Sequence, residues 1–230
     1  MKKENSLIPE SIRKEAEINK SFSIRFADSI ESLEVANKIW SAVYKEELSW
    51  LPKNSKQTVY HDAYHEYSRY MLAYVDGKPA GLMRLVHNSD VGFPVNQFVA
   101  TDDMIKEENA SAIECQRLLV LPEYREARSS ELPFGIWPAF MKATLQYCLR
   151  YSIGYMLADC FLYTPTTPIK SLLRIGFQKT GVEFMDTELA DMGPSTVLVL
   201  DNRDMLKFIY SKQRPFNKYL ATHDASIYLP

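Results

Sequence analysis

The sequence predicts an α/β fold in which a mixed central sheet carries helices on both faces. Three observations predict this class: strand patterns outnumber helix patterns in the middle of the chain, two of them flank a hairpin turn, and one strand-helix-strand unit follows residue 112. Hydrophobic residues make up 46% of the 230 residues and aromatic residues 12%, which is enough to build a sizeable core.

The first fifty residues divide into an arm, a strand and a helix. Residues 1–20 are polar and charged, and we expect an N-terminal arm. Phe22, Ile24 and Phe26 alternate with other residues in the manner of a strand. Asp28 is suited to cap the following helix, whose apolar stripe consists of Ile30, Leu33, Val35, Ile39, Trp40, Val43 and Tyr44.

A loop and a hairpin follow this helix. Residues 49–69 are turn-rich, polar and aromatic, and we expect a long loop with one short helix. Loops of this length inside a compact domain are often functional. Within residues 70–87, two strand patterns flank Asp76-Gly77, a dipeptide that favours a hairpin turn.

The second half of the chain alternates strands with helices. Pro133 or Pro138 fits a helix only in its first turn, and Gly176 marks the end of a shorter helix. The predicted elements are a strand at 112–121, a helix at 131–152, a buried strand at 153–161, a short helix at 164–177, a strand at 195–201 and a C-terminal helix from residue 202. We expect residues 21–201 to form the domain and residues 202–230 a helical extension that packs on it.

Composition excludes several classes of protein. A formal charge of -2 does not suit a nucleic-acid binder. The N-terminus lacks the apolar stretch of a secretory signal, and no apolar run is long enough to span a membrane. Three scattered cysteines fit a reducing compartment. We expect a cytoplasmic protein that touches a membrane only peripherally, if its product is lipidic.

The stretch ECQRLLVLPEYREARSSELP (114–133) places charge at the start of an apolar strand and ends in a basic turn. Backbone N–H groups at a helix N-terminus bind anions. Arg125 and Arg128 would add positive charge there, and Ser129 and Ser130 hydroxyl donors, so the turn suits a phosphate group. A solvated basic loop with serine caps would explain the same residues.

These patterns resemble the GNAT acyltransferase superfamily. LLVLPEYREARSSELP (118–133) resembles its acyl-donor stretch, and LLRIGF (172–177) its later helix-Gly-Phe signature. The resemblance implies that parallel strands at 114–121 and 153–161 splay apart and that a thioester-bearing pantetheine arm enters the gap. It also implies donor binding by the turn described above and by the backbone of Leu119, Val120 and Leu121.

A narrower resemblance is to N-acyl amino acid synthases and LuxI-type autoinducer synthases. Asp62 in HDAYHEYS, Arg84 in GLMRLV, and Glu114 with Arg117 in ECQRL match that group's acid, hairpin arginine and E-x-x-R, and Trp50 matches its tryptophan. The resemblance implies an N-acyltransferase that moves a fatty acyl group onto the amine of an amino acid or similar small molecule. Acyl-CoA or the acyl-phosphopantetheine of acyl carrier protein would be the co-substrate, with no permanently bound cofactor.

Two departures from the group's pattern concern the substrates. Where the group has D-x-x-D-x-x-S, this chain has Asp62, His65 and Ser68, so Glu66 is a candidate to replace the missing charge. The phosphate turn lacks the glycines of the pattern Q/R-x-x-G-x-G/A. Both coenzyme A and acyl carrier protein therefore stay open as donors, the latter as a protein partner.

Acyl transfer to an amine needs a group that takes a proton and a group that positions the acceptor. Glu114 is expected to be the base or to hold the amine, with Asp62 as the alternative for the amine. Arg84 or Arg117 would grip a substrate carboxylate. Strict alternation puts Glu114 and Arg117 on opposite faces, and only a bulge or strand end brings them together. Alternatively, Glu114 pairs with Arg84 or Arg117 and only orders the sheet.

Other residues complete the predicted site. Trp50, His65 and Glu66 are expected near the acceptor, and Phe134 and Trp137 beside the acyl chain. His61 and His65 have no obvious third ligand, so we predict no metal site. Cys115 is read as a buried strand residue rather than a nucleophile.

Two other functions stay open at this stage. One is an acyl-homoserine-lactone-type synthase that uses S-adenosylmethionine. The other is a non-catalytic, acyl-binding regulatory module on the same scaffold. The acyl length, the acceptor amine and the oligomeric state are left open.

Overall fold

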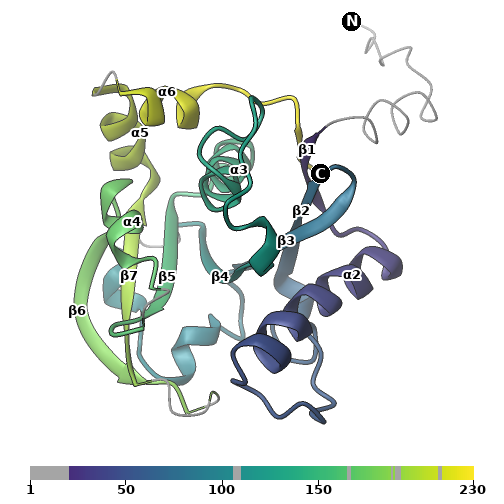
Figure 1. Cartoon of the computed structure of the whole chain (residues 1–230). Helices are drawn as coiled ribbons and strands as arrows, with labels where there is room; N and C mark the ends of the chain where they lie inside the picture. The colour runs from purple at the N-terminus through teal and green to yellow at the C-terminus, as the bar shows by residue number, and fades with distance from the viewer. Residues whose placement is uncertain (1–20, 106–109, 165–166, 188, 190–192, 212–213) are drawn as a thin grey trace, which may run out of the picture.

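The computed structural model describes residues 21–105, 110–164, 167–187, 189, 193–211 and 214–230, so the predicted arm at 1–20 lies outside the described residues. One mixed sheet has the strand order β6-β7-β5-β4-β3-β2-β1-β8 (Figure 1). Its strands are β1 (Phe22–Phe26), β2 (Ser68–Val75), β3 (Lys78–His87), β4 (Ala112–Val120), β5 (Tyr155–Phe161), β6 (Gln178–Met185), β7 (Pro194–Asp201) and β8 (Ile227–Tyr228). The predicted fold class is confirmed.

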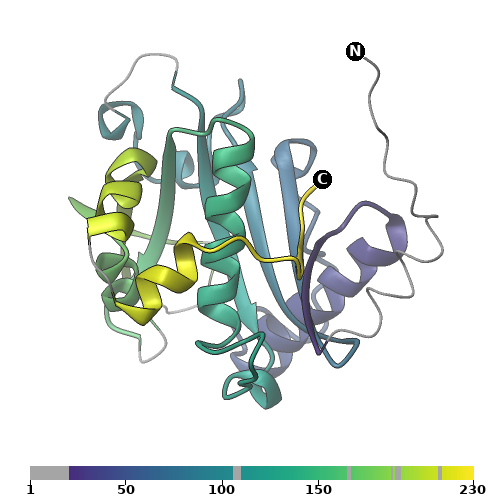
Figure 2. The same cartoon turned by 90° about the horizontal axis from the view of Figure 1, so that it is seen from above.

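Helices cover both faces of this sheet, as Figure 2 shows. The helices are α2 (Ile30–Ser41), which a π-helical turn at Ala42–Glu47 extends, α3 (Ile136–Arg150), α4 (Ile169–Arg174), α5 (Asn202–Ser211) and α6 (Pro215–Ala221). Phe140 of α3 and Met205 of α5 belong to the main core cluster, whereas Ile39 and Trp40 of α2 form a second cluster on the other face. In the described part of the chain, none of the helices has the length and apolarity to cross a bilayer.

The start of α2 is capped by Ser29, one residue after the predicted cap. The Ser29 hydroxyl accepts the Ser32 N–H at 3.2 Å, and the Ser32 hydroxyl accepts the Ser29 N–H at 3.0 Å. This reciprocal arrangement satisfies two backbone donors at the helix end. The prediction of Asp28 as the cap was therefore wrong by one position.

The hairpin predicted at residues 70–87 is confirmed. Strands β2 and β3 pair antiparallel, and Asp76 and Gly77 have φ angles of 49° and 72°. Two consecutive positive φ angles define the turn type that matches the twist of a two-residue hairpin. Arg84 of β3 lies opposite Tyr70 of β2, so the hairpin carries one predicted site residue into the middle of the sheet.

The predicted separation of two parallel strands is present between β4 and β5. Their register covers only three pairs: Ala112 with Tyr155, Ile113 with Met156, and Glu114 with Leu157. Beyond Glu114, β4 continues alongside β3 and β5 alongside β7. The middle of the sheet therefore opens towards the C-terminal ends of both strands.

Some elements differ from the prediction. The strand β6 was not predicted, because its Gly181 and its exposed alternate residues give only a weak strand signal. The C-terminal helix is two helices, since Pro215 begins α6 after an extended Arg214. Helix α3 starts at Ile136 rather than at 131, and Pro138 lies in its first turn as expected.

Gly81 allows β3 to lie close to β4, and we expect Gly81→Ala to destabilise the fold. A Cβ there would lie 2.8 Å from the backbone oxygen of Leu119 and 3.1 Å from the Phe140 ring. Overpacking of this kind costs about 1–3 kcal/mol, measurable as a lower free energy of unfolding in denaturant titrations. Gly154→Ala is the matched control, because its nearest neighbour is at 3.6 Å. Equal effects of both changes would contradict the prediction.

Candidate active site

A cavity of about 700 Å³ occupies the gap where β4 and β5 separate. Residues of β4 from Cys115 to Val120 and of β5 from Ala158 to Phe161 form its walls. The first turn of α3 and the loop after α2 close it on either side. The cavity thus lies in the gap that the family resemblance implies as the binding site of the acyl donor.

Side-chain alternation divides the cavity between the two faces of the sheet. Cys115, Ala158 and Cys160 belong to the core cluster beneath α3 and make that side apolar. Gln116 and Asp159 lie one residue out of step with these positions, so they face the opposite side, where Asp62 and Arg117 also line the cavity. The cavity therefore offers an apolar compartment and a polar compartment that meet at the gap.

Asp62 joins two arginines in the polar compartment. Its carboxylate accepts two hydrogen bonds of 2.6 Å from the guanidinium of Arg84 and one of 3.0 Å from Arg117. Burial alone would raise the pKa of Asp62, but the bonds and charge of Arg84, with the charge of Arg117, lower it below its ordinary value. Asp62 is therefore an ionised anchor for both arginines.

Arg84 is fully buried, and all three of its nitrogens are engaged. Its Nε donates to the Ser68 hydroxyl at 2.8 Å, and its other nitrogens bind Asp62. Arg84 does not line the cavity. Arg84 thus links Asp62 to Ser68, and its position does not suit the expected grip on a substrate carboxylate.

Arg117 reaches the polar compartment through a bulge in β4. The β3–β4 register shifts between Leu82 and Arg84, and Arg117 has a φ of 50°, a left-handed conformation. The bulge brings Arg117 to the side of the sheet that holds Asp62, the Val59 carbonyl and the ring of Trp40, all of which it contacts. A bulge, one of the two ways considered for bringing Arg117 and Glu114 together, is therefore present, but Arg117 bonds to Asp62 rather than to Glu114.

Glu114 is buried beside the cavity and does not line it. Its carboxyl oxygens accept the Val95 N–H at 3.1 Å and the Gln116 side-chain amide at 2.8 Å. Neither Arg84 nor Arg117 bonds to it, so the alternative of an ion pair with these arginines is wrong. Burial, followed by the charge of Asp159, raises the pKa of Glu114 to about 8, which keeps the group protonated at neutral pH.

Asp159 is an acid of the cavity wall that sequence analysis did not select. It lies on β5 two residues after Leu157, the last β5 residue that pairs with β4. Burial, with the nearby charge of Asp186, raises the pKa of Asp159 to about 6. The available signal was a single acid within the otherwise apolar strand at 153–161.

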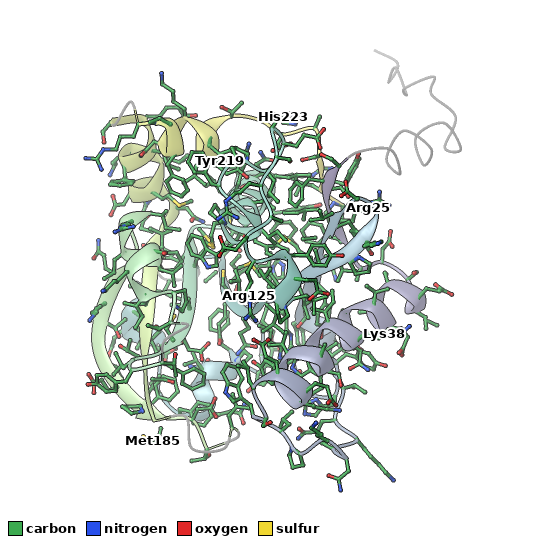
Figure 3. All side chains as sticks on the ribbon, viewed as in Figure 1. Arg25, Lys38, Arg125, Met185, Tyr219 and His223 are labelled. Carbon is green, nitrogen blue, oxygen red and sulfur yellow. The ribbon has the colours of Figure 1, made fainter. Side chains whose placement is uncertain are left out.

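Both arginines of the basic turn lie at the cavity, as predicted from the sequence. Arg125, near the middle of the view in Figure 3, pairs with Glu47 at 2.7 Å and donates to the Val120 carbonyl at 3.1 Å. Arg128 donates to the carbonyls of Arg125 and Ala127 and packs over Gly135, whose φ is 90°. Both arginines line the cavity.

The predicted serines of this turn do not line the cavity. Ser129 accepts the Leu132 N–H at 3.1 Å, and Ser130 is exposed. Helix α3 begins at Ile136, so its free N–H groups belong to the residues at its start rather than to the serines. The expected contribution of the two hydroxyls to phosphate binding has no support in this geometry.

The predicted aromatic residues divide in the same way. Trp50, Phe134 and Trp137 line the cavity, and Trp50 packs edge-on against Phe161 at the end of β5. His65 instead lies 3.2 Å from the Tyr70 hydroxyl, and Glu66 is exposed; neither lines the cavity. Glu66 therefore does not supply the charge expected in place of the second acid.

In the part of the chain that the structure describes, no His, Cys, Asp or Glu group has the arrangement of a metal site.

Known proteins share this architecture. The sequence matches the family model of the acetyltransferase (GNAT) domain over residues 41–134. The structure resembles FeeM, an N-acyl amino acid synthase from uncultured soil microbes, with a TM-score of 0.63, 14% identity, and coverage of 81% of this chain and 93% of that one. A comparison with curated proteins gave no match.

Two further solved structures have the same fold. BjaI, a coenzyme A-dependent acyl-homoserine lactone synthase solved with MTA, has a TM-score of 0.59 and 15% identity over 90% of this chain and 92% of its own. YncA from Salmonella typhimurium, solved with its cofactor acetyl-CoA, has a TM-score of 0.54 and 13% identity over 80% of this chain and 95% of its own. The chain therefore has the GNAT fold, as the sequence predicted, and residues 41–134 match the model of the GNAT acetyltransferase domain.

Removing the Asp62 carboxylate should destabilise the protein strongly. Asp62→Ala leaves the fully buried Arg84 guanidinium without its anion, and breaking a buried pair in this way costs about 3 kcal/mol or more. Asp204→Ala is the control: its pair with Lys207 is exposed and should contribute less than about 1 kcal/mol. Denaturant titration of both variants measures the difference, and similar losses would contradict the anchoring role of Asp62.

The stability gained by Glu114→Gln should increase with pH. The unfolded chain releases the Glu114 proton near the ordinary pKa of 4.5, whereas the folded protein holds it to about 8, so the wild type loses stability as pH rises across this window. Glutamine resembles the neutral carboxyl group and removes this loss, which we expect to be on the order of 4 kcal/mol at pH 8.

Unfolding free energies of the wild type and Glu114→Gln at pH 5 and pH 8 test this expectation. Glu183→Gln, at an exposed glutamate of β6, is the control. A difference between wild type and Glu114→Gln that stays constant over this range would show that Glu114 is ionised in the folded protein.

Proposed function

We propose that this protein is an N-acyltransferase that moves a fatty acyl group from the thioester of acyl-CoA or acyl carrier protein to the amine of an amino acid or similar small molecule. The observation that carries the proposal is the cavity in the gap between β4 and β5, with apolar walls on one face of the sheet and polar groups on the other. An acyl transfer from thioester to amine needs both environments at one point.

The backbone of β4 supports binding of the donor in the gap. The Leu121 N–H donates to the Ala80 carbonyl of β3 at 2.9 Å. Because successive residues of a strand point their N–H groups to opposite sides, the Val120 N–H points towards the gap. It is suited to bind an amide of pantetheine or the thioester oxygen, whose charge develops during transfer. Among the three predicted backbone contacts, Val120 is therefore favoured and Leu121 is not.

The donor phosphate has a matching position at the start of α3. The N–H groups of Ile136 and Trp137 open the helix, and Pro138 contributes none. Arg125 and Arg128 border the same part of the cavity, and positive charge beside a helix N-terminus suits a phosphate. Coenzyme A and acyl carrier protein both present phosphopantetheine, so this position fits either donor.

The acyl chain would occupy the apolar compartment. Met83, Cys115, Met141, Cys160 and Leu172 line it. Unbranched methionine side chains adapt to flexible apolar ligands. The polar compartment would then receive the acceptor, whose amine must lose a proton before it attacks the thioester carbon. We place the reaction in the cytoplasm, with acyl carrier protein as a candidate protein partner.

A panel of donors and acceptors tests the proposal. The donors are decanoyl and hexadecanoyl thioesters of coenzyme A and of acyl carrier protein. The acceptors are the standard amino acids, ethanolamine, putrescine and S-adenosylmethionine. We expect an N-acyl product, detected by its mass, together with release of the donor thiol. No product from any pairing of a folded protein would refute an acyltransferase role and favour a binding module, whereas a lactone from S-adenosylmethionine would identify a lactone synthase.

Variants at the donor end of the cavity refine this test. Arg128→Ala should raise the KM for the donor about tenfold, which corresponds to the loss of one charge-assisted contact of about 1.4 kcal/mol, with little change in kcat. Arg174→Ala, at an exposed arginine of α4 outside the cavity, is the control. An unchanged KM in Arg128→Ala would exclude this arginine from donor binding.

A further inference from the structure

The two acids beside the gap have different access to the cavity. Asp159 is part of the cavity wall, whereas Glu114 is not. Both oxygens of Glu114 already accept hydrogen bonds, from the Val95 N–H and the Gln116 amide. An acceptor in the polar compartment therefore meets Asp159 and cannot reach Glu114 without breaking these bonds.

Asp159 is available to bind a cation. Among the described residues, no ion pair with a lysine or arginine engages its carboxylate, and the charge that favours its ionised form is that of Arg117. Gln116, Arg117 and Tyr64 line the same cavity and would surround an acceptor beside it. Asp159 is half-buried. A carboxylate that is partly removed from water without a strong partner is costly, and an ammonium group would satisfy it.

Three titratable groups from two segments of the chain surround Asp159. Arg117 of β4 favours its ionised form, and Asp186, just after β6, disfavours it. Glu114 of β4 is the third group, and its own pKa is raised by burial and by the charge of Asp159. A protonated Glu114 and an ionised Asp159 are thus mutually consistent, because two adjacent carboxylates do not readily ionise together.

We propose that Asp159 is the catalytic carboxylate that binds the ammonium group of the acceptor and takes its proton, and that Glu114 exchanges no proton with the acceptor. This inference rests on the proposed N-acyltransferase function. It differs from the expectation drawn from the sequence, in which Glu114 is the base.

In the proposed step, each proton and each electron pair has a defined destination. Asp159 takes one proton from the ammonium, and the freed lone pair of the nitrogen forms the bond to the thioester carbon. The C=O electron pair moves to oxygen and returns as the C–S bond breaks. The second proton of the nitrogen goes to the departing thiolate, and Asp159 releases its proton to solvent. The products are an amide, a thiol and one proton.

Steady-state kinetics of Asp159→Asn, Asp159→Glu and Glu114→Gln test the inference, with decanoyl-CoA as the donor and the panel amine that the wild type acylates fastest. Loss of a general base lowers the rate by about 10²–10⁴-fold, so we expect Asp159→Asn to lose at least about 100-fold in kcat. Asp159→Glu should recover part of this loss. Glu114→Gln should keep kcat within about threefold, far less than the loss of a base would cause.

Two readouts separate a base from a structural residue. The wild-type kcat/KM for the acceptor should rise with pH as Asp159 ionises, and this limb should disappear in Asp159→Asn. Binding of coenzyme A, measured by calorimetry, should be unchanged in that variant, which also shows that the cavity is folded. Asp159→Asn that retains kcat, or Glu114→Gln that loses as much as Asp159→Asn, would overturn the assignment of the base while the acyltransferase function stands. A wild type without product on the whole panel would instead overturn the proposed function.

Discussion

The separation of β4 from β5 after Glu114 is the constraint on which the rest of this structure depends. Only three register pairs hold the two strands together at their N-terminal ends. Backbone groups beyond that point no longer satisfy one another across the gap, and such groups require a partner. A ligand with a chain of amides would supply one, and this supports the proposal that the donor binds in the gap.

Ionisable side chains lie inside the protein beside the gap between β4 and β5. Their neighbours determine which of these side chains are ionised. Asp62 compensates Arg84 and Arg117, so the two arginines are tolerated at low exposure. Glu114 avoids the same cost by staying protonated. Asp159, on the cavity wall, has its pKa raised only to about 6, so the surroundings of each acid, rather than the residue type, distinguish it from Glu114.

Much of the fold was predictable because its signals are local. The Asp76-Gly77 turn, the alternation of β1 and the apolar stripe of α2 each depend on a few neighbouring residues. The strand β6 was missed because it pairs with β7 at an edge of the sheet and carries exposed residues on alternate positions. Its stability comes from this pairing, which no local pattern encodes.

Sequence patterns predicted most strands and helices in their order, without β6 and with one C-terminal helix in place of two. The family resemblance implied the splayed strand pair and a site that includes Asp62, Arg84 and Arg117. Tertiary structure decided which of them face the cavity. The bulge at Arg117 and the bonds of Glu114 to Val95 and Gln116 depend on strands and loops that are distant in the chain. Side-chain direction and proton affinity follow from such three-dimensional neighbours, because burial and nearby charge, rather than residue type, set which group is ionised.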